Sequence, residues 1–168
     1  MRAACLFLSA ILYAMALTDC AWAQAIYDNA PPCAQPLPQG EDFTFLTDDH
    51  VKIAGTFYYP LSCLQDPQAA KGKKYPAVLM LHMWKRDRKE WLGLTKLLQA
   101  QDFAVMTIDF RGHGESVWRA NGQPLKNWDF AQITTEAAQA YRLLIAKDLV
   151  DPDHLSIVGA SLGGTKAC

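Results

Sequence analysis

Three short apolar runs, separated by segments with helical periodicity, restrict the fold of this chain more than any other feature. The runs lie at residues 77–81, 103–110 and 155–158. Each has the length of a strand and is apolar on both faces, which is typical of strands covered by helices on both sides. The order strand, helix, strand, helix, strand predicts a parallel sheet with right-handed crossovers, and so an α/β fold.

The two segments between these runs have the pattern of amphipathic helices. Asp87, followed three residues later by Glu90, indicates an N-cap with its capping-box partner at the start of the first helix. The apolar residues at helical spacing are Trp91, Leu94, Leu97 and Leu98 in the first segment and Phe130, Ile133, Ala137, Tyr141, Leu144 and Ile145 in the second. We expect a turn at residues 151–153 before the third strand.

Two further strands are expected ahead of this unit. Residues 43–45 and 51–59 alternate in polarity and are separated by Asp48, Asp49 and His50, which predicts an antiparallel hairpin that ends at Pro60. Residues 61–74 are interpreted as a surface loop. We therefore assign residues 41–168 to one α/β domain with an N-terminal antiparallel hairpin.

The first 40 residues differ in character from this domain. Arg2 precedes an apolar run at residues 3–17, and Ala21-Trp22-Ala23 fits the small-x-small rule, which predicts a signal peptide over residues 1–23 and export to the periplasm or beyond. A membrane anchor is the alternative, but the run is shorter than the ~20 residues that span a bilayer. A lipoprotein at Cys20 is disfavoured by the acidic Asp19. Residues 24–40 are proline-rich and predict an extended leader.

Composition and charge exclude some classes of function. Hydrophobic residues make up 51% of the chain, and the net charge of −1 offers no basic surface for nucleic acid or anionic membranes. The densest basic stretch, residues 85–89, contains Asp87, and we interpret it as a solvated helix start. In an oxidising compartment Cys33 and Cys63 either form a disulfide or remain two unpaired thiols, and Cys168 has no assigned role.

The third strand runs into Gly159-Ala160-Ser161-Leu162-Gly163, a G-x-S-x-G motif. A strand that reverses at once into a helix leaves its turn residue strained, with room only for small residues on either side. The motif predicts that Ser161 is a nucleophile and that the Leu162 N–H is an oxyanion donor. One alternative is a glycine-rich turn with a solvated serine. A phosphate-binding loop is excluded because Thr165-Lys166 reverses the required order.

Three segments in this order resemble the N-terminal half of an α/β-hydrolase: VLMLHMW, IDFRGHGES and IVGASLGG. The resemblance covers residues 43–166 and is closest to serine aminopeptidase-like and monoacylglycerol-lipase-like esterases. It implies Ser161 as nucleophile, with the backbone N–H groups of Leu162 and Trp84 as oxyanion donors. Members usually have His-Gly where this chain has His82-Met83, so Met83 is alternatively an acyl-pocket residue. Dienelactone-hydrolase-like relatives generally have cysteine at the position of Ser161.

The resemblance also implies which residues are not catalytic. The family order is nucleophile, acid, histidine, so the triad acid and base are expected after Ser161. The four histidines His50, His82, His113 and His154 are therefore expected to be structural or loop residues. Asp109 and Arg111 are expected to form a loop-fixing pair, and Trp118 and Trp128 either cover a hydrophobic substrate or belong to the core.

The sequence thus predicts an exported serine hydrolase that cleaves a carboxylic ester, or a peptide or amide bond, through an acyl-enzyme. It predicts no cofactor, no metal, a small-molecule or acyl substrate, and no nucleic-acid partner or stable membrane span after signal cleavage. We expect the whole protein to continue past Cys168, for roughly another hundred residues. The alternative is a catalytically inactive hydrolase-like fragment or binding module.

Overall fold

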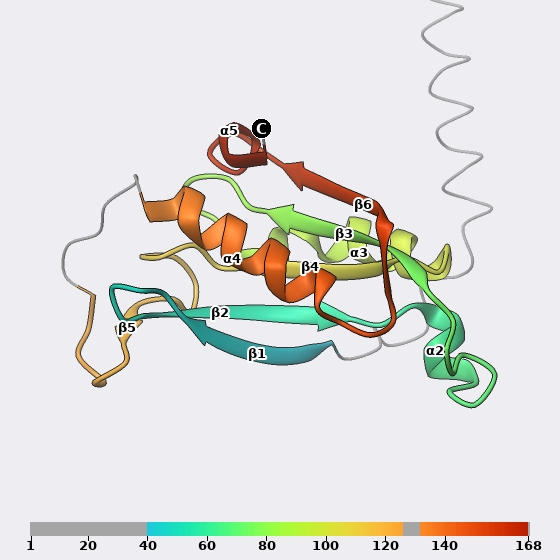
Figure 1. Ribbon diagram of the computed structural model, residues 1–168. Coiled ribbons are helices and arrows are strands. Elements are labelled where there is room, and N and C mark those ends of the chain that lie inside the picture. Colours follow the sequence, from blue (N-terminus) through green and yellow to red (C-terminus); the bar gives the residue numbers. More distant parts are fainter. Residues whose placement is uncertain (1–39, 126–131, 168) are drawn as a thin grey trace, which may run out of the picture. The chain divides into compact units, whose positions relative to one another are not determined.

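The computed structural model describes residues 40–125 and 132–167, which form a mixed six-stranded sheet with helices on both faces (Figure 1). The strands are β1 (Glu41–Leu46), β2 (Val51–Tyr58), β3 (Tyr75–Leu81), β4 (Ala104–Ile108), β5 (Trp118–Arg119) and β6 (Val150–Gly159). The helices are α2 (Leu61–Gln65), the 3-10 helix η1 (Arg88–Trp91), α3 (Leu92–Ala100), α4 (Ile133–Ile145) and α5 (Gly164–Ala167). The predicted signal peptide, almost all of the leader, Cys33, Trp128, Phe130 and Cys168 lie outside the described residues.

The sheet has the order β1-β2-β4-β3-β6, with β5 paired to β2. Strand β3 pairs in parallel with β4 and β6, which confirms the parallel strands expected from the three apolar runs. Strands β1 and β2 form the expected antiparallel hairpin, and β2 joins β4 in antiparallel register. The α/β class with an N-terminal hairpin is therefore confirmed, and the sheet as a whole is mixed.

The alternation of side chains along β3 explains the helix on each face. Leu79 and Leu81 pack in the same core cluster as residues of α4, whereas Val78 and Met80 cluster with residues from the α3 side of the sheet. Figure 1 shows α4 and α3 on opposite faces of β3 and β4. Full burial of a leucine side chain contributes about 1.5–3 kcal/mol to folding. A strand with two apolar faces is therefore stable only between two helices.

Two local predictions need correction. Part of the expected loop at residues 61–74 forms the short helix α2. Asp87 does cap the next helical segment, since its side chain accepts a hydrogen bond from the Lys89 N–H at 2.9 Å, but that segment begins as the 3-10 helix η1. Glu90 does not complete a capping box, because its carboxylate accepts a hydrogen bond from the Met83 N–H instead.

Strand β6 is longer than expected and contains the residues predicted to turn. Tyr75 of β3 pairs with Val150, and Ala77, two residues on, pairs with Leu155. Residues 151–154 therefore form an irregularity within β6 and not a turn ahead of it. Ile157 and Val158 are only half-buried, because β6 lies at an edge of the described sheet. None of the described helices is both long and apolar enough to cross a bilayer.

Candidate active site

Ser161 occupies the turn that leaves β6, in a conformation that serine seldom adopts. Its φ of 49° lies in the left-handed region, which costs a non-glycine residue roughly 1–2 kcal/mol. The turn is closed by the Gly163 N–H, which donates to the Ala160 carbonyl at 2.9 Å, and the Thr165 N–H donates to the Ser161 carbonyl at 3.0 Å. The Ser161 side chain is exposed. A strained, exposed serine at the end of a parallel strand is the geometry that the motif predicted.

The two glycines of the motif are required by the close approach of backbone atoms. A Cβ atom on Gly159 would lie 2.3 Å from the Gly163 carbonyl carbon, and one on Gly163 would lie 2.1 Å from the Leu81 carbonyl oxygen. Neither position accepts a side chain without movement of the backbone. The contact between Gly163 and the end of β3 also places the Ser161 turn against the loop that contains Trp84.

That loop begins with His82, which is fully buried. Its Nε2 atom accepts a hydrogen bond from the Phe110 N–H at 2.9 Å, so Nε2 carries no proton. The Nδ1 atom lies 2.7 Å from the Met83 carbonyl oxygen and must therefore be the protonated nitrogen that donates to it. Burial lowers the pKa of His82 below its ordinary value. Both ring nitrogens are therefore engaged in hydrogen bonds to the backbone, which agrees with the predicted structural role of His82.

Both backbone polar groups of Met83 are held by side chains. Its carbonyl accepts from His82, and its N–H donates to the Glu90 Oε1 atom at 2.9 Å. Because C=O and N–H point in opposite directions across a trans peptide, the bond to His82 directs the Trp84 N–H away from that imidazole. The role of Glu90 was missed at the sequence level, because its spacing from Asp87 also fits a capping box.

The loop after β4 is fixed by two buried ion pairs. Asp109 is paired with Arg88, and its carboxylate also accepts from the Arg88 N–H at 2.6 Å and the Glu115 N–H at 2.9 Å. Arg111 is paired with Glu136 and with Asp49. The expectation that Asp109 and Arg111 pair with each other is therefore wrong: each fixes the loop through a different partner.

The pKa values of the two carboxylates that pair with Arg111 differ because the two side chains differ in burial and in hydrogen bonding. Glu136 is completely buried, and this burial raises its pKa above the ordinary value even though Arg111 opposes the shift. Asp49 is more exposed, and hydrogen bonds from the Arg111 guanidinium hold the pKa of its carboxyl far below the usual range. The Arg111 guanidinium is therefore shared between a partly exposed carboxylate and a buried one.

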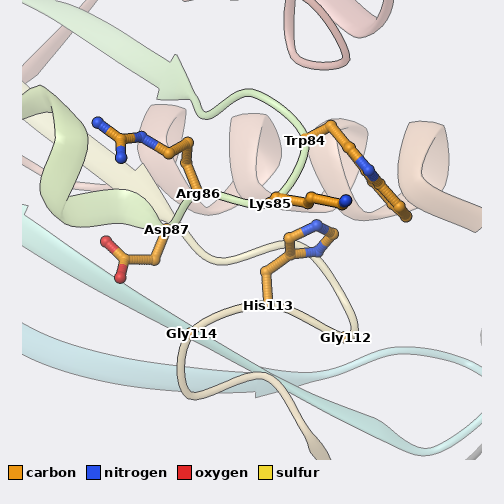
Figure 2. Close-up of a pocket in the computed structure, with 7 residues that line it drawn as sticks. All are labelled: Trp84, Lys85, Arg86, Asp87, Gly112, His113 and Gly114. Carbon is orange, nitrogen blue, oxygen red and sulfur yellow. The ribbon is translucent and has the colours of Figure 1, made fainter.

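A pocket of about 410 Å³ opens between the loops that follow β3 and β4. Its lining residues are Trp84, Lys85, Arg86, Asp87, Gly112, His113 and Gly114. Figure 2 shows the Trp84 and His113 rings on one side of the pocket and the Arg86 and Asp87 side chains on the other. Ser161 does not line this pocket. The pocket includes Trp84, whose backbone N–H is an expected oxyanion donor.

The other histidines have local partners or lie far along the chain from the serine. His113 is buried, and its Nδ1 atom lies 3.0 Å from the Arg111 carbonyl oxygen. His154 pairs with Asp151 in the irregular part of β6, and His50 occupies the β1–β2 turn with a φ of 61°. The expectation that none of them is the triad base stays a prediction.

Three further predictions concern a metal site, Trp118 and Cys63. Within residues 40–125 and 132–167, no group of three or more His, Cys, Asp or Glu side chains is arranged to hold a metal ion. Trp118 is 48% exposed on β5 and is therefore not a core residue. Among the described residues Cys63 forms no disulfide, and its pairing with Cys33 stays a prediction.

A comparison with protein-family models finds no match for this chain. Among curated proteins, an uncharacterized protein of Mycobacterium tuberculosis is 28% identical over 137 residues, which are 82% of this chain and 43% of that protein. A serine hydrolase-like protein of Mus musculus is 32% identical over 100 residues, covering 57% of this chain and 29% of that protein. The chain therefore spans less than half the length of these relatives.

Solved structures show a closer likeness in fold than in sequence. The α/β hydrolase GrgF from Penicillium sp. sh18 has a TM-score of 0.59 and 23% identity, covering 77% of this chain and 40% of that one. An esterase from Pyrococcus furiosus has a TM-score of 0.56 and 18% identity, covering 77% of this chain and 44% of that one.

Proposed function

Since this chain has the fold of the α/β-hydrolases, we propose that the whole protein is a serine hydrolase that cleaves a carboxylic ester through an acyl-enzyme on Ser161. The observation that carries the proposal is the left-handed Ser161 between two glycines that backbone contacts require. Strain of this kind persists where the surrounding structure enforces it, and it is concentrated at functional sites. An exposed serine in an ordinary turn needs neither glycine.

In the proposed reaction the Ser161 oxygen attacks the ester carbonyl and the alcohol leaves, and water then releases the acid. The negative charge on the tetrahedral intermediate is held by backbone N–H groups, for which we propose Leu162 and Trp84. Trp84 is preferred to Met83 because the Met83 N–H already donates to Glu90. A general base is also needed, and we expect it and its acid partner outside the described residues.

The experiment that tests this proposal is covalent labelling of the full-length protein from its native host with a fluorophosphonate. We expect one label, located on Ser161 by peptide mass spectrometry and absent in Ser161→Ala. Ser156→Ala is the matched control, because Ser156 is an exposed serine on β6, the strand that leads into the Ser161 turn. A folded protein that is never labelled would instead favour the second candidate, a hydrolase-like binding module without turnover. Comparing the rates at which the protein hydrolyses matched ester and amide substrates decides whether it cleaves an ester or an amide bond.

We also propose that the protein is exported, on the strength of the signal-peptide pattern in residues 1–23. N-terminal sequencing of the protein recovered from the host envelope or medium tests this. A mature chain that begins at Gln24 supports export, and a retained Met1 in the cytoplasm contradicts it.

A further inference from the structure

We propose that the pocket between the β3 and β4 loops binds a flat, carboxylate-bearing part of the substrate, and that Lys85 is its counter-ion. This inference rests on the proposed function, because it names the class of ester that the Ser161 site accepts. The pocket, of about 410 Å³, is large enough for one such group. It also includes Trp84, whose backbone N–H is the proposed second oxyanion donor. A group held there would lie against the loop that carries this proposed donor.

The charges that line the pocket favour an anion. Arg86 is paired with Glu90 at 3.5 Å, and the Asp87 carboxylate caps η1 through the Lys89 N–H. Lys85 is the other cation of the lining. Figure 2 shows its side chain extended toward the side of the pocket where the Trp84 and His113 rings lie, away from Asp87. A carboxylate on that side would meet the ammonium group without meeting the acidic residue.

The rings on that side favour a flat group. Trp84 and His113 contact each other edge to face, with ring centroids 5.1 Å apart and planes at 71°. His113 is supported in turn by the His82 ring at 5.0 Å. Both residues line the pocket, so a planar group bound there can pack against aromatic surface.

The backbone at Lys85 gives an independent reason to assign it a function. The Arg86 N–H donates to the Met83 carbonyl at 3.2 Å, which makes Lys85 the third residue of a four-residue turn. Its φ of 62° is the positive value for which glycine or asparagine is the usual choice at such a position. A lysine here adds strain and, because it is exposed, little packing. This strain at an exposed lysine is consistent with a role for its side chain in binding.

The test compares two 4-nitrophenyl esters of equal shape in the full-length protein, the 4-carboxybenzoate and the 4-carbamoylbenzoate. The first carries the charge and the second replaces it with a neutral amide. We expect the ratio of their kcat/KM values to fall roughly two- to fivefold in Lys85→Met, as for loss of an exposed ion pair, and to be retained in Lys85→Arg. Lys89→Met removes an exposed lysine outside the pocket and should leave the ratio unchanged. Raising the salt concentration should lower the wild-type ratio toward that of Lys85→Met.

Each outcome decides the matter. An equal ratio in the wild type and Lys85→Met overturns the inference and leaves the nucleophile in place, provided that Ser161→Ala abolishes turnover. The same holds if the wild type is labelled at Ser161 by the fluorophosphonate but cleaves neither ester. If Lys89→Met lowers the ratio as much as Lys85→Met does, the effect comes from the overall electrostatic potential of the protein, and the proposed role of Lys85 is overturned. A wild type without labelling or turnover overturns both proposals together.

Discussion

The Glu90 carboxylate accepts a hydrogen bond from the Met83 backbone N–H at 2.9 Å, and so a side chain of η1 holds the loop that follows β3. Its side chain is only 12% exposed, and Arg86 on the same loop lies 3.5 Å from the second carboxylate oxygen. These contacts hold the loop at Met83, the position where the resemblance noted in the sequence leads one to expect glycine. We expect Glu90 to act as a positioning residue for the proposed Trp84 donor.

Glu90→Ala should lower kcat roughly tenfold on an activated ester with little change in KM, because a loosened donor is lost mainly in the transition state. Glu90→Gln keeps an acceptor oxygen and should retain most of kcat. Steady-state kinetics with the two variants, together with their thermal unfolding, provide the check. Equal losses in both variants would show that charge and not position matters.

Gly163→Ala should prevent the Ser161 turn from forming, because its Cβ atom would lie 2.1 Å from a backbone oxygen of β3. We expect loss of fluorophosphonate labelling and destabilisation by several kcal/mol, the range of severe overpacking. Gly93→Ala in α3 is the matched control, since a Cβ atom there meets nothing within 4 Å. That variant should be up to about 1 kcal/mol more stable than the wild type in denaturant unfolding. Normal labelling of Gly163→Ala would contradict the steric argument.

Arg111→Met should destabilise the protein by about 3–5 kcal/mol, because it leaves the fully buried Glu136 carboxylate without its cation. The double variant Arg111→Met with Glu136→Leu removes both charges and should recover part of that loss. Urea unfolding of the single and double variants measures the difference. A double variant that is less stable than Arg111→Met would mean that Glu136 contributes mainly through other contacts.

The stability contributed by His82 should depend on pH. Because burial lowers the pKa of His82 in the folded state, the unfolded state binds the proton more readily, and stability falls as pH drops below the unfolded value of about 6.5. The difference in unfolding free energy between the wild type and His82→Gln should therefore be largest above pH 7 and shrink toward pH 5. Glu136 titrates in the opposite sense but is common to both proteins. If the difference in unfolding free energy between the two proteins is the same at every pH, His82 does not change its proton affinity on folding.

The type and order of most elements could be predicted because hydrophobic periodicity is a local property of the chain. The hairpin, the strands of residues 77–81 and 103–110, and the helices after them follow from it. The errors lie where local signals compete. Residues 151–153 have the composition of a turn, but pairing with β3 keeps them within β6 as an irregularity. Glu90 has the spacing of a capping box but is drawn to Met83.

The candidate site was predictable in part. The position of Ser161 followed from a motif whose glycines have a steric reason, and the structure places that serine in a left-handed turn. The pocket at Lys85 and the support from Glu90 were not predictable. The pocket depends on loops after β3 and β4 that become neighbours only when the two strands pair. The contact of Glu90 with Met83 forms within the segment after β3, where the capping-box spacing gave a competing signal.

The sequence by itself determined the α/β class, the strand order along the chain and the place of the strained serine, because each depends on short-range spacing. The tertiary structure alone decided which charges meet. Arg88 pairs with Asp109 across 21 residues of sequence, and Arg111 pairs with Glu136 across 25 and with Asp49 across 62. The physical reason is burial. A charged side chain that is removed from water needs an opposite charge nearby, and folding of the sheet supplies one whatever the separation along the chain.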